Sequence, residues 1–272
     1  MIGKLYHYAH ALEFRLFQMY ELSLMKRMDE PTRSQLRRRI WRSPSEAEDW
    51  VNILRFFDPS ERVLLVDIGA NVGDFTSGFF SFFQNARSVC FEPVSSTFEQ
   101  LSKRFSGDKR VELHRCALSD ADGSAEIYVQ EDSTLCTLTK YTDDANAAYG
   151  TESAAREETP CRRLDNMEFD KARGRLFVKI DVQGFEIEVI RGGMRTLALA
   201  DAVLLECSFA DEYENKEPSF PQACTLLSEC GLYPIVFQDY GRVVSNYAFE
   251  RDVLFVKREL LSKIWFRNYL SG

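Results

Sequence analysis

The chain has 272 residues, 45% of them hydrophobic, and a formal net charge of −8 at pH 7. Its size suits one main domain of about 200 residues with an appendage, and its acidic balance excludes broad, sequence-independent nucleic-acid binding, which needs a positive field. No apolar run approaches the roughly 20 residues of a membrane-spanning helix, and the charged residues of the N-terminal stretch argue against a signal peptide. The seven cysteines include no C-x-x-C pair, which favours reduced thiols and a cytoplasmic location.

The first 58 residues are predicted to form a helical extension. In residues 4–28, apolar side chains recur at alternating spacings of four and three, which predicts a helix with one apolar face. They are Leu5, Ala9, Leu12, Leu16 and Met19. We expect this face to dock on the chain's own domain, with a homodimer or a peripheral membrane contact as alternatives. Several arginines follow in residues 33–42, and a capping box of Ser45 and Glu48 predicts a second helix.

From Arg62 onward, short apolar runs alternate with helical stretches, which is typical of a parallel sheet with helices on both faces. The predicted strands are Val63–Ile68, Ser88–Glu92, Val111–Cys116, Leu176–Asp181, Ala202–Cys207, Tyr233–Gln238 and Asp252–Lys257. We expect residues 59–258 to form this α/β domain and residues 259–272 to form a C-terminal helical tail.

A long insertion separates the third and fourth of these strands. It contains a predicted strand at Ser124–Val129, a polar stretch rich in small residues from Glu131 to Pro160, and a strand that ends near Leu164. So long a stretch without strong periodicity is usually functional or mobile. It is a candidate lid over a site, and a disordered surface loop is an equally good interpretation.

The first predicted strand runs into a glycine-containing turn, VDIGANVGDFT, at residues 66–76. Glycines at 69 and 73 allow positive φ and let a ligand approach the backbone closely. A dinucleotide-binding turn would need further glycines at the positions of Asn71 and Asp74, and an acidic side chain at a helix N-terminus repels a pyrophosphate. The turn therefore favours an unphosphorylated ligand with a positive centre. S-adenosylmethionine, with its sulfonium and ammonium groups, has both properties.

The second predicted strand ends in Phe91-Glu92-Pro93. A carboxylate at this distance from the turn can accept hydrogen bonds from both ribose hydroxyls of a nucleoside, and Pro93 ends the strand at the crevice. A lone glutamate at a strand end is most often an ordinary solvated residue. Its spacing from the turn favours the ribose role for Glu92.

The fourth predicted strand carries charge within the sequence FVKIDVQGFE, residues 177–186. Lys179 and Asp181 are two residues apart, so on a strand they share a face. A buried lysine is costly unless it is paired, and Asp67, Asp181 or a ligand carboxylate would neutralise it. The crevice of a doubly wound sheet lies at the carboxyl ends of the strands, where we expect Asp67 and Asp181 on adjacent strands.

These carboxylates suit methyl transfer, an in-line displacement in which the enzyme mainly aligns donor and acceptor, worth up to ~7–11 kcal/mol. A hydroxyl acceptor also needs a base within hydrogen-bond reach. Asp181 is the first candidate for this base and Glu186 the second. Glu206, at the end of the next strand, could join Asp181 around a divalent cation. A strand-end acid bonded to the backbone or to Ser208 is at least as good an interpretation of Glu206.

In these segments the chain resembles the FkbM-type family of S-adenosylmethionine-dependent methyltransferases, over about residues 62–257. The resemblance rests on VDIGANVGDFT (66–76), FEP (91–93), ALSDADGSAEIYV (117–129), RRLDNM (162–167), VKIDVQGFEIEVIRGG (178–193) and LLECS (204–208). Many methyltransferases share the glycine turn, and KIDVQGFE in order with the other motifs is more specific. The resemblance implies a Rossmann-like class I methyltransferase fold, with a seven-stranded, mostly parallel sheet and an antiparallel last strand.

Matched position by position, the resemblance implies a site for S-adenosylmethionine. The methionine part would lie in the turn, the ribose on Glu92 and the adenine beside Ala117 and Leu118, while Lys179 and Asp181 would face the methyl transfer. A hydroxyl-rich stretch at residues 133–138 would lie close to the cofactor. The implied catalytic residues are Asp181, Lys179 and Glu186. The implied cofactor-binding residues are Asp67, Gly69, Asn71, Gly73, Phe75, Thr76, Glu92, Pro93, Ala117, Leu118, Ser133 and Asp181.

Members of this family commonly methylate hydroxyl groups of sugars or polyketide-type natural products. The resemblance therefore implies an O-methyltransferase with a small-molecule or glycan acceptor, such as a carbohydrate, a glycolipid or a natural product. An RNA or protein methyltransferase that docks through the arginines of residues 33–42 is one alternative, although a solvated helix face explains those arginines better. A non-catalytic S-adenosylmethionine-binding assembly protein is another. Salt-sensitive RNA binding would favour the first, and a bound donor that is never turned over would favour the second.

Overall fold

The computed structural model describes residues 50, 52–151, 155–168, 174–237 and 250–261. The chain divides into two compact units, residues 1–59 and 60–272, and every strand that the structure describes lies in the second unit. The predicted N-terminal helix, the arginines of residues 33–42 and most of the predicted C-terminal tail lie outside the described residues. Within the described residues, no helix has the length and apolar character needed to span a membrane.

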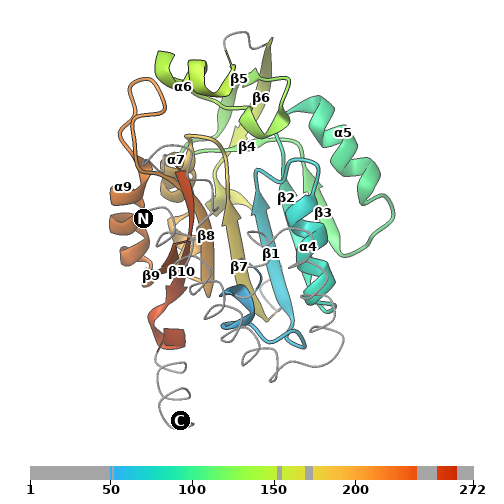
Figure 1. Cartoon of the computed structure of the whole chain (residues 1–272). Helices are drawn as coiled ribbons and strands as arrows, with labels where there is room; N and C mark the ends of the chain where they lie inside the picture. Colours follow the sequence, from blue (N-terminus) through green and yellow to red (C-terminus); the bar gives the residue numbers. More distant parts are fainter. Residues whose placement is uncertain (1–49, 51, 152–154, 169–173, 238–249, 262–272) are drawn as a thin grey trace, which may run out of the picture. The chain divides into compact units, whose positions relative to one another are not determined.

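A seven-stranded sheet forms the centre of the second unit (Figure 1). Its order is β3-β2-β1-β7-β8-β10-β9, and neighbouring strands are parallel except at β10, which runs antiparallel to β8 and β9. The strands are β1 (Val63–Ile68), β2 (Arg87–Phe91), β3 (Val111–His114), β7 (Arg175–Ile180), β8 (Ala202–Ser208), β9 (Leu232–Phe237) and β10 (Glu250–Lys257). The predicted fold class is confirmed, and the ends of the seven predicted strands agree with the observed ends to within about two residues.

Helices cover both faces of this sheet (Figure 1). One face is covered by α4 (Asp74–Phe82) and α5 (Ser95–Arg104), with Leu101 of α5 packed against Cys90 of β2. The other face is covered by α7 (Glu186–Gly192), α8 (Met194–Leu197) and α9 (Ser219–Glu229). Parallel strands buried on both faces need apolar residues at most positions, which is why β1 and β2 read as continuous apolar runs.

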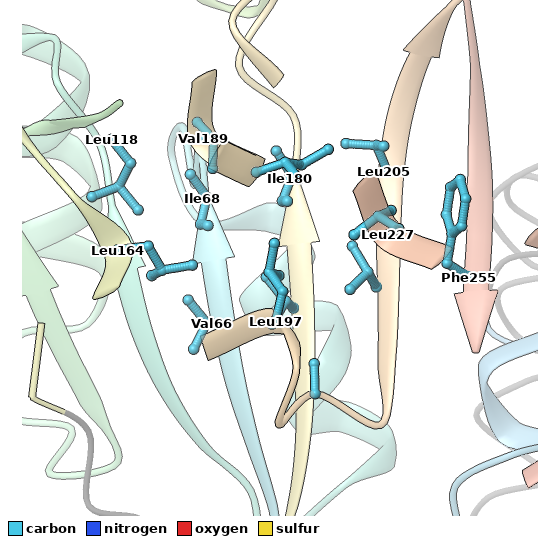
Figure 2. Packing of buried hydrophobic residues seen from close by; sticks show 14 of the residues in the cluster. Val66, Ile68, Leu118, Leu164, Ile180, Val189, Leu197, Leu205, Leu227 and Phe255 are labelled. Carbon is cyan, nitrogen blue, oxygen red and sulfur yellow. The ribbon is translucent and has the colours of Figure 1, made fainter. Parts of the chain in front are cut away.

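The face toward α7, α8 and α9 is purely apolar near the middle of the sheet (Figure 2). Every second side chain of β1 and β7 points to this face, among them Val66, Ile68 and Ile180. They pack with Leu197 of α8 and Leu227 of α9. All of these side chains are buried. Burial of one such side chain stabilises the fold by about 1.5–3 kcal/mol, so this cluster is the main hydrophobic core.

The insertion after β3 folds into a second, three-stranded sheet, which lies beyond the carboxyl ends of β1 and β7 (Figure 1). Its order is β4-β6-β5, with β6 parallel to β4 and antiparallel to β5. The strands are β4 (Ala117–Leu118), β5 (Gly123–Val129) and β6 (Ala155–Arg162). Between β5 and β6 lie a 3-10 helix, η1 (Ser133–Leu135), and α6 (Asp143–Tyr149), and η2 (Leu164–Asn166) follows β6.

The interpretation of this insertion as a disordered loop is therefore wrong for its described residues. Capping interactions define both ends of α6. At its start the Thr142 hydroxyl accepts a hydrogen bond from the Ala145 amide, and at its end Gly150 adopts a left-handed conformation. Such a short polar helix has no apolar periodicity to reveal it in the sequence.

Candidate functional site

A cavity of about 630 Å³ lies at the carboxyl ends of the central strands. The chain order of the strands reverses between β1 and β7, so this edge is the switch point at which ligands bind in open α/β sheets. The cavity is lined by the turn after β1, by Glu92 after β2, by Asp181 after β7 and by η1 of the insertion. The predicted position of the crevice agrees with this arrangement.

The turn after β1 is held against both neighbouring strands. The amides of Gly69 and Ala70 both donate to the Phe91 carbonyl at 3.0 Å. Gly69 has φ +75°, and a Cβ there would lie 1.7 Å from the Asp181 carbonyl oxygen, so only glycine lets β7 approach this closely. Asn71 is also left-handed, with φ 49°, and its backbone N–H donates to Glu92 Oε2 at 3.0 Å.

Glu92 is a buried carboxyl on the wall of the cavity. It is 5% exposed, its Oε2 accepts from Asn71, and its Oε1 accepts from the Val94 amide at 2.9 Å. Burial raises the pKa of Glu92 to about 7, although both backbone hydrogen bonds favour the ionised form. Each carboxylate oxygen has two lone pairs, so the group can still accept hydrogen bonds from a ligand in the cavity.

Lys179 and Asp181 form an ion pair beside the turn, with 2.8 Å between Nζ and Oδ2. Burial by itself would lower the pKa of Lys179, but the carboxylates of Asp181 and Asp67 raise it above its ordinary value. Burial raises the pKa of Asp181, but the charge and hydrogen bond of Lys179, together with the hydrogen bonds of Glu206 and Gln183, lower it below its ordinary value, which favours the ionised form. The expected neutralisation of the buried lysine is confirmed, and Phe75 lies 5.5 Å below the ammonium.

The far wall of the cavity carries further acids. The side-chain amide of Gln183 donates to Asp181 Oδ1 at 3.2 Å and to Glu206 Oε2. Ser208 instead exchanges hydrogen bonds with Ser219. Burial raises the pKa of Glu206 well above its ordinary value and that of Glu250 to about 10. Within the described part of the chain, no three His, Cys, Asp or Glu side chains are grouped to hold a metal ion, and we do not propose one.

An apolar end of the cavity lies between the main sheet and the insertion. Phe91, Ala117, Leu118 and Ile127 line it. Ser133 of η1 closes the same region, where its hydroxyl donates to the Asn71 side chain at 3.0 Å. A flat aromatic group such as a purine base fits a wall of this composition.

Several predicted site residues lie behind the cavity wall. Asp67 is 0% exposed, accepts a hydrogen bond from the Thr76 hydroxyl at 2.6 Å, and does not line the cavity. Its register partner on β7 is Lys179, so Asp67 lies next to this lysine, behind the cavity wall. Gly73 precedes α4 and faces Leu101 of α5. Thr76, also 0% exposed, does not line the cavity either. The remaining cofactor candidates do line it: Gly69, Asn71, Phe75, Glu92, Pro93, Ala117, Leu118, Ser133 and Asp181.

Glu186 is separated from the other catalytic candidates. It lines a second cavity of about 310 Å³, and its Oε1 accepts from the Gly184 amide at 2.9 Å.

Two residues, Gln183 and Glu250, line the main cavity but are not among the predicted site residues. The pair Gln183-Gly184 is a turn signal that could have indicated the first. No local signal marks Glu250, which β10 brings into place from a distant part of the chain.

Comparison with known proteins gives one matching family and several similar solved structures. A family model described as Methyltransferase FkbM domain matches residues 67–232, and comparison with curated proteins finds no match. Among solved structures, the methyltransferase FkbM from Methylobacillus flagellatus KT is 14% identical, with a TM-score of 0.49, and the alignment covers 86% of this chain and 57% of that one.

Two further solved structures are similar at a comparable level. Human N-acetylserotonin methyltransferase, in complex with SAM, is 14% identical over 80% of this chain and 57% of that one, with a TM-score of 0.39. An O-methyltransferase from neocarzinostatin biosynthesis, in complex with S-adenosyl-L-homocysteine, is 10% identical over 76% of this chain and 53% of that one, with a TM-score of 0.41. This chain thus spans little more than half of each of these three structures.

Proposed function

The chain belongs to the FkbM methyltransferase family, and on that premise we propose that it transfers the methyl group of S-adenosylmethionine to a hydroxyl of a carbohydrate, a glycolipid or another natural product. One observation carries the proposal. A single cavity at the switch point of the sheet joins the glycine turn, the Glu92 carboxyl and the ionised Asp181. We take residues 59–258 as the domain that performs this reaction.

The donor would lie across the β1–β2 side of this cavity. Its ribose hydroxyls would donate to Glu92, and its adenine would lie against Leu118 and Phe91 on the apolar wall. Its sulfonium and ammonium would lie near the turn, beside the Asp181 carboxylate, whose pKa is lowered. Opposite charge within about 4–6 Å stabilises each ion in a partly buried site.

Transfer would proceed as an in-line displacement at the methyl carbon. The acceptor oxygen forms a bond to carbon as the carbon–sulfur bond breaks, and the positive sulfonium becomes the neutral thioether of S-adenosylhomocysteine. The hydroxyl proton passes to the Asp181 carboxylate. A carboxylate of lowered pKa is a sufficient base, because the oxygen becomes strongly acidic as it is alkylated.

The hydrogen-bonding groups of the far wall select the acceptor. Asp181, Glu206 and Glu250 line this side, and Lys179, which is paired with Asp181, is the one basic side chain among the described lining residues. The raised pKa values of Glu206 and Glu250 favour their protonated forms, so the wall offers no unpaired cation to an anionic acceptor, whereas neutral hydroxyl groups can exchange hydrogen bonds with its carboxyl groups. This supports a polyhydroxylated, uncharged acceptor.

Calorimetry with S-adenosylmethionine and S-adenosylhomocysteine tests the donor site. We expect both to bind, and absence of binding by either would remove the proposal. Transfer of a labelled methyl group to a panel of neutral glycans and polyhydroxylated natural products then tests the reaction. Donor binding without S-adenosylhomocysteine formation on any acceptor would favour the non-catalytic alternative. Asp181→Asn serves as the control, because it should lower turnover far more than it lowers S-adenosylhomocysteine affinity.

A further inference from the structure

Gln183 has an unusual backbone conformation for its residue type. It lies two residues after Asp181 in the turn that follows β7, has φ 52° and is 9% exposed. The next residue, Gly184, is also left-handed, with φ +88°, and a Cβ there would lie 2.7 Å from ring atoms of Tyr213. Non-glycine residues adopt positive φ uncommonly, and where they do the surroundings must hold them there.

The surroundings hold Gln183 through every polar atom of its side chain. Its amide nitrogen donates to Asp181 Oδ1 at 3.2 Å and to Glu206 Oε2. Its Oε1 accepts from the hydroxyls of Tyr141 at 3.2 Å and Tyr213 at 3.5 Å. The amide has one orientation that satisfies all four contacts, because the reverse orientation would turn its carbonyl toward two carboxyls.

The amide of Gln183 donates to two neighbouring carboxyls that also hydrogen-bond to each other. Asp181 follows β7 and Glu206 lies on the adjacent strand β8. Neighbouring carboxyls share a proton, and the donors around each of them decide which one is the anion. Here each carboxyl receives an N–H from Gln183, and Asp181 receives the Lys179 ammonium on its other oxygen. Asp181 is thus clamped at both oxygens by donors, which favour its ionised form.

We propose that Gln183 is a positioning residue for methyl transfer, which orients Asp181 and Glu206 through its side-chain amide and keeps Asp181 as the anion that faces the sulfonium of the donor. This inference rests on the proposed function and extends it to a residue of the same cavity that acts through Asp181. The two tyrosines connect the amide to the insertion and to the segment after β8. The hydroxyl of Thr137 in the insertion also donates to the backbone carbonyl of Gln183, so the insertion contacts the turn that carries the amide.

The ratio of S-adenosylmethionine affinity to S-adenosylhomocysteine affinity measures the charge that faces the sulfonium. Both ligands share the adenosine, so the titration of Glu92 cancels in the ratio. The other ionisable groups around Asp181 and its partners are Lys179, Asp67, Glu186, Glu206, Glu250, Asp252, Tyr141 and Tyr213. In the unaltered protein, we expect a ratio that is level between about pH 6 and about pH 8, because Asp181 stays ionised over that range.

Gln183→Ala should lower the ratio about tenfold at pH 7, as expected for the loss of one charge-assisted interaction. Gln183→Glu replaces the amide with a third carboxyl of the same shape, so the ratio should rise steeply with pH as the shared protons leave. Asp181→Asn defines full loss of the anion. Gln222→Glu is the matched control, because Gln222 bonds to Arg191 on the surface of α9 and does not line the main cavity.

A merely structural role would change the thermal stability of the variants and leave the ratio level with pH. That result in both Gln183→Ala and Gln183→Glu would overturn the inference. If these two variants do not fold, Gln183→Asn replaces them: asparagine tolerates a left-handed backbone, and its shorter side chain loses at least one of the two carboxyl contacts. Failure of the unaltered protein to bind either ligand would refute the proposed function. Binding with an unaffected ratio in the variants would refute only the role of Gln183.

Discussion

The two faces of strands β1 and β7 differ sharply although the same strands build both. Toward α7, α8 and α9, Val66, Ile68 and Ile180 are entirely apolar neighbours in the core (Figure 2). On the face toward α4, the Phe177 ring packs against the rings of Phe75 and Phe79. The next residues on this face are Lys179 and its register partner Asp67. Side chains alternate along a strand, so one pair of strands carries both a hydrocarbon core and a buried ionic cluster.

The comparison teaches where this fold can bury charge. An ion in the middle of the sheet would be surrounded by hydrocarbon, whereas an ion at the carboxyl end meets the turn, the cavity and other ions. Lys179 is tolerated because Asp181 lies 2.8 Å away and Asp67 lies opposite. Burial of such groups is unfavourable in itself, so their presence at this edge indicates a functional requirement.

The largest effect is expected on the polar face. Lys179→Ala would leave two buried carboxylates without their cation and should lower the free energy of unfolding by about 3–5 kcal/mol. Denaturant unfolding measures this loss. Lys216→Ala is the matched control, because the Lys216 side chain pairs with Glu188 at 2.7 Å and is 25% exposed, against 11% for Lys179, so this variant should lose about 1 kcal/mol or less. Equal losses in the two variants would contradict the importance of burial.

On the apolar face, Leu197→Ala should lower the free energy of unfolding by about 2–5 kcal/mol, since it removes a fully buried side chain from the core. Donor affinity should stay almost unchanged, because Leu197 does not line the cavity. Unfolding and calorimetry on the same sample separate the two quantities. A large loss of donor affinity would show that the two faces are not independent.

At the cavity wall, Glu92→Ala should weaken donor binding by the value of one or two charge-assisted hydrogen bonds, roughly 1.5–3 kcal/mol each. Calorimetry with S-adenosylhomocysteine measures the change. Glu186→Gln provides a comparison, because burial raises the pKa of Glu186 to about 7 as well, yet this side chain lines the other cavity. Unchanged affinity in Glu92→Ala would refute the ribose assignment.

The smallest effect concerns pH. The pKa of Glu92 is raised from 4.5 to about 7 by burial, and ribose hydroxyls donate best to its ionised form. S-adenosylhomocysteine affinity should therefore rise about tenfold from pH 6 to pH 8 and then level off. The folded state holds this proton more tightly than the unfolded state does, so the contribution of Glu92 to stability should decline as pH rises from 4.5 to about 7. Glu92→Gln should flatten both dependences, and a persistent slope would assign them to another group.

Much of this site could be predicted from residues close together in the chain. Gly69 and Asn71 form a turn directly after an apolar run, and Glu92 ends the next such run. Lys179 and Asp181 share a strand face because their spacing is two. These are local consequences of backbone geometry and side-chain chemistry, and strands, turn and crevice follow from them without knowledge of distant contacts.

Sequence alone determined the α/β class, the glycine turn and the carboxylates at the strand ends. Tertiary structure alone decided which of them face the cavity: Asp67 and Gly73 lie behind its wall, Glu186 lines another cavity, and Gln183 and Glu250 join the site. The physical reason is that strand order and side-chain burial arise from contacts between segments far apart in the chain, and these contacts leave no periodic trace within any one segment.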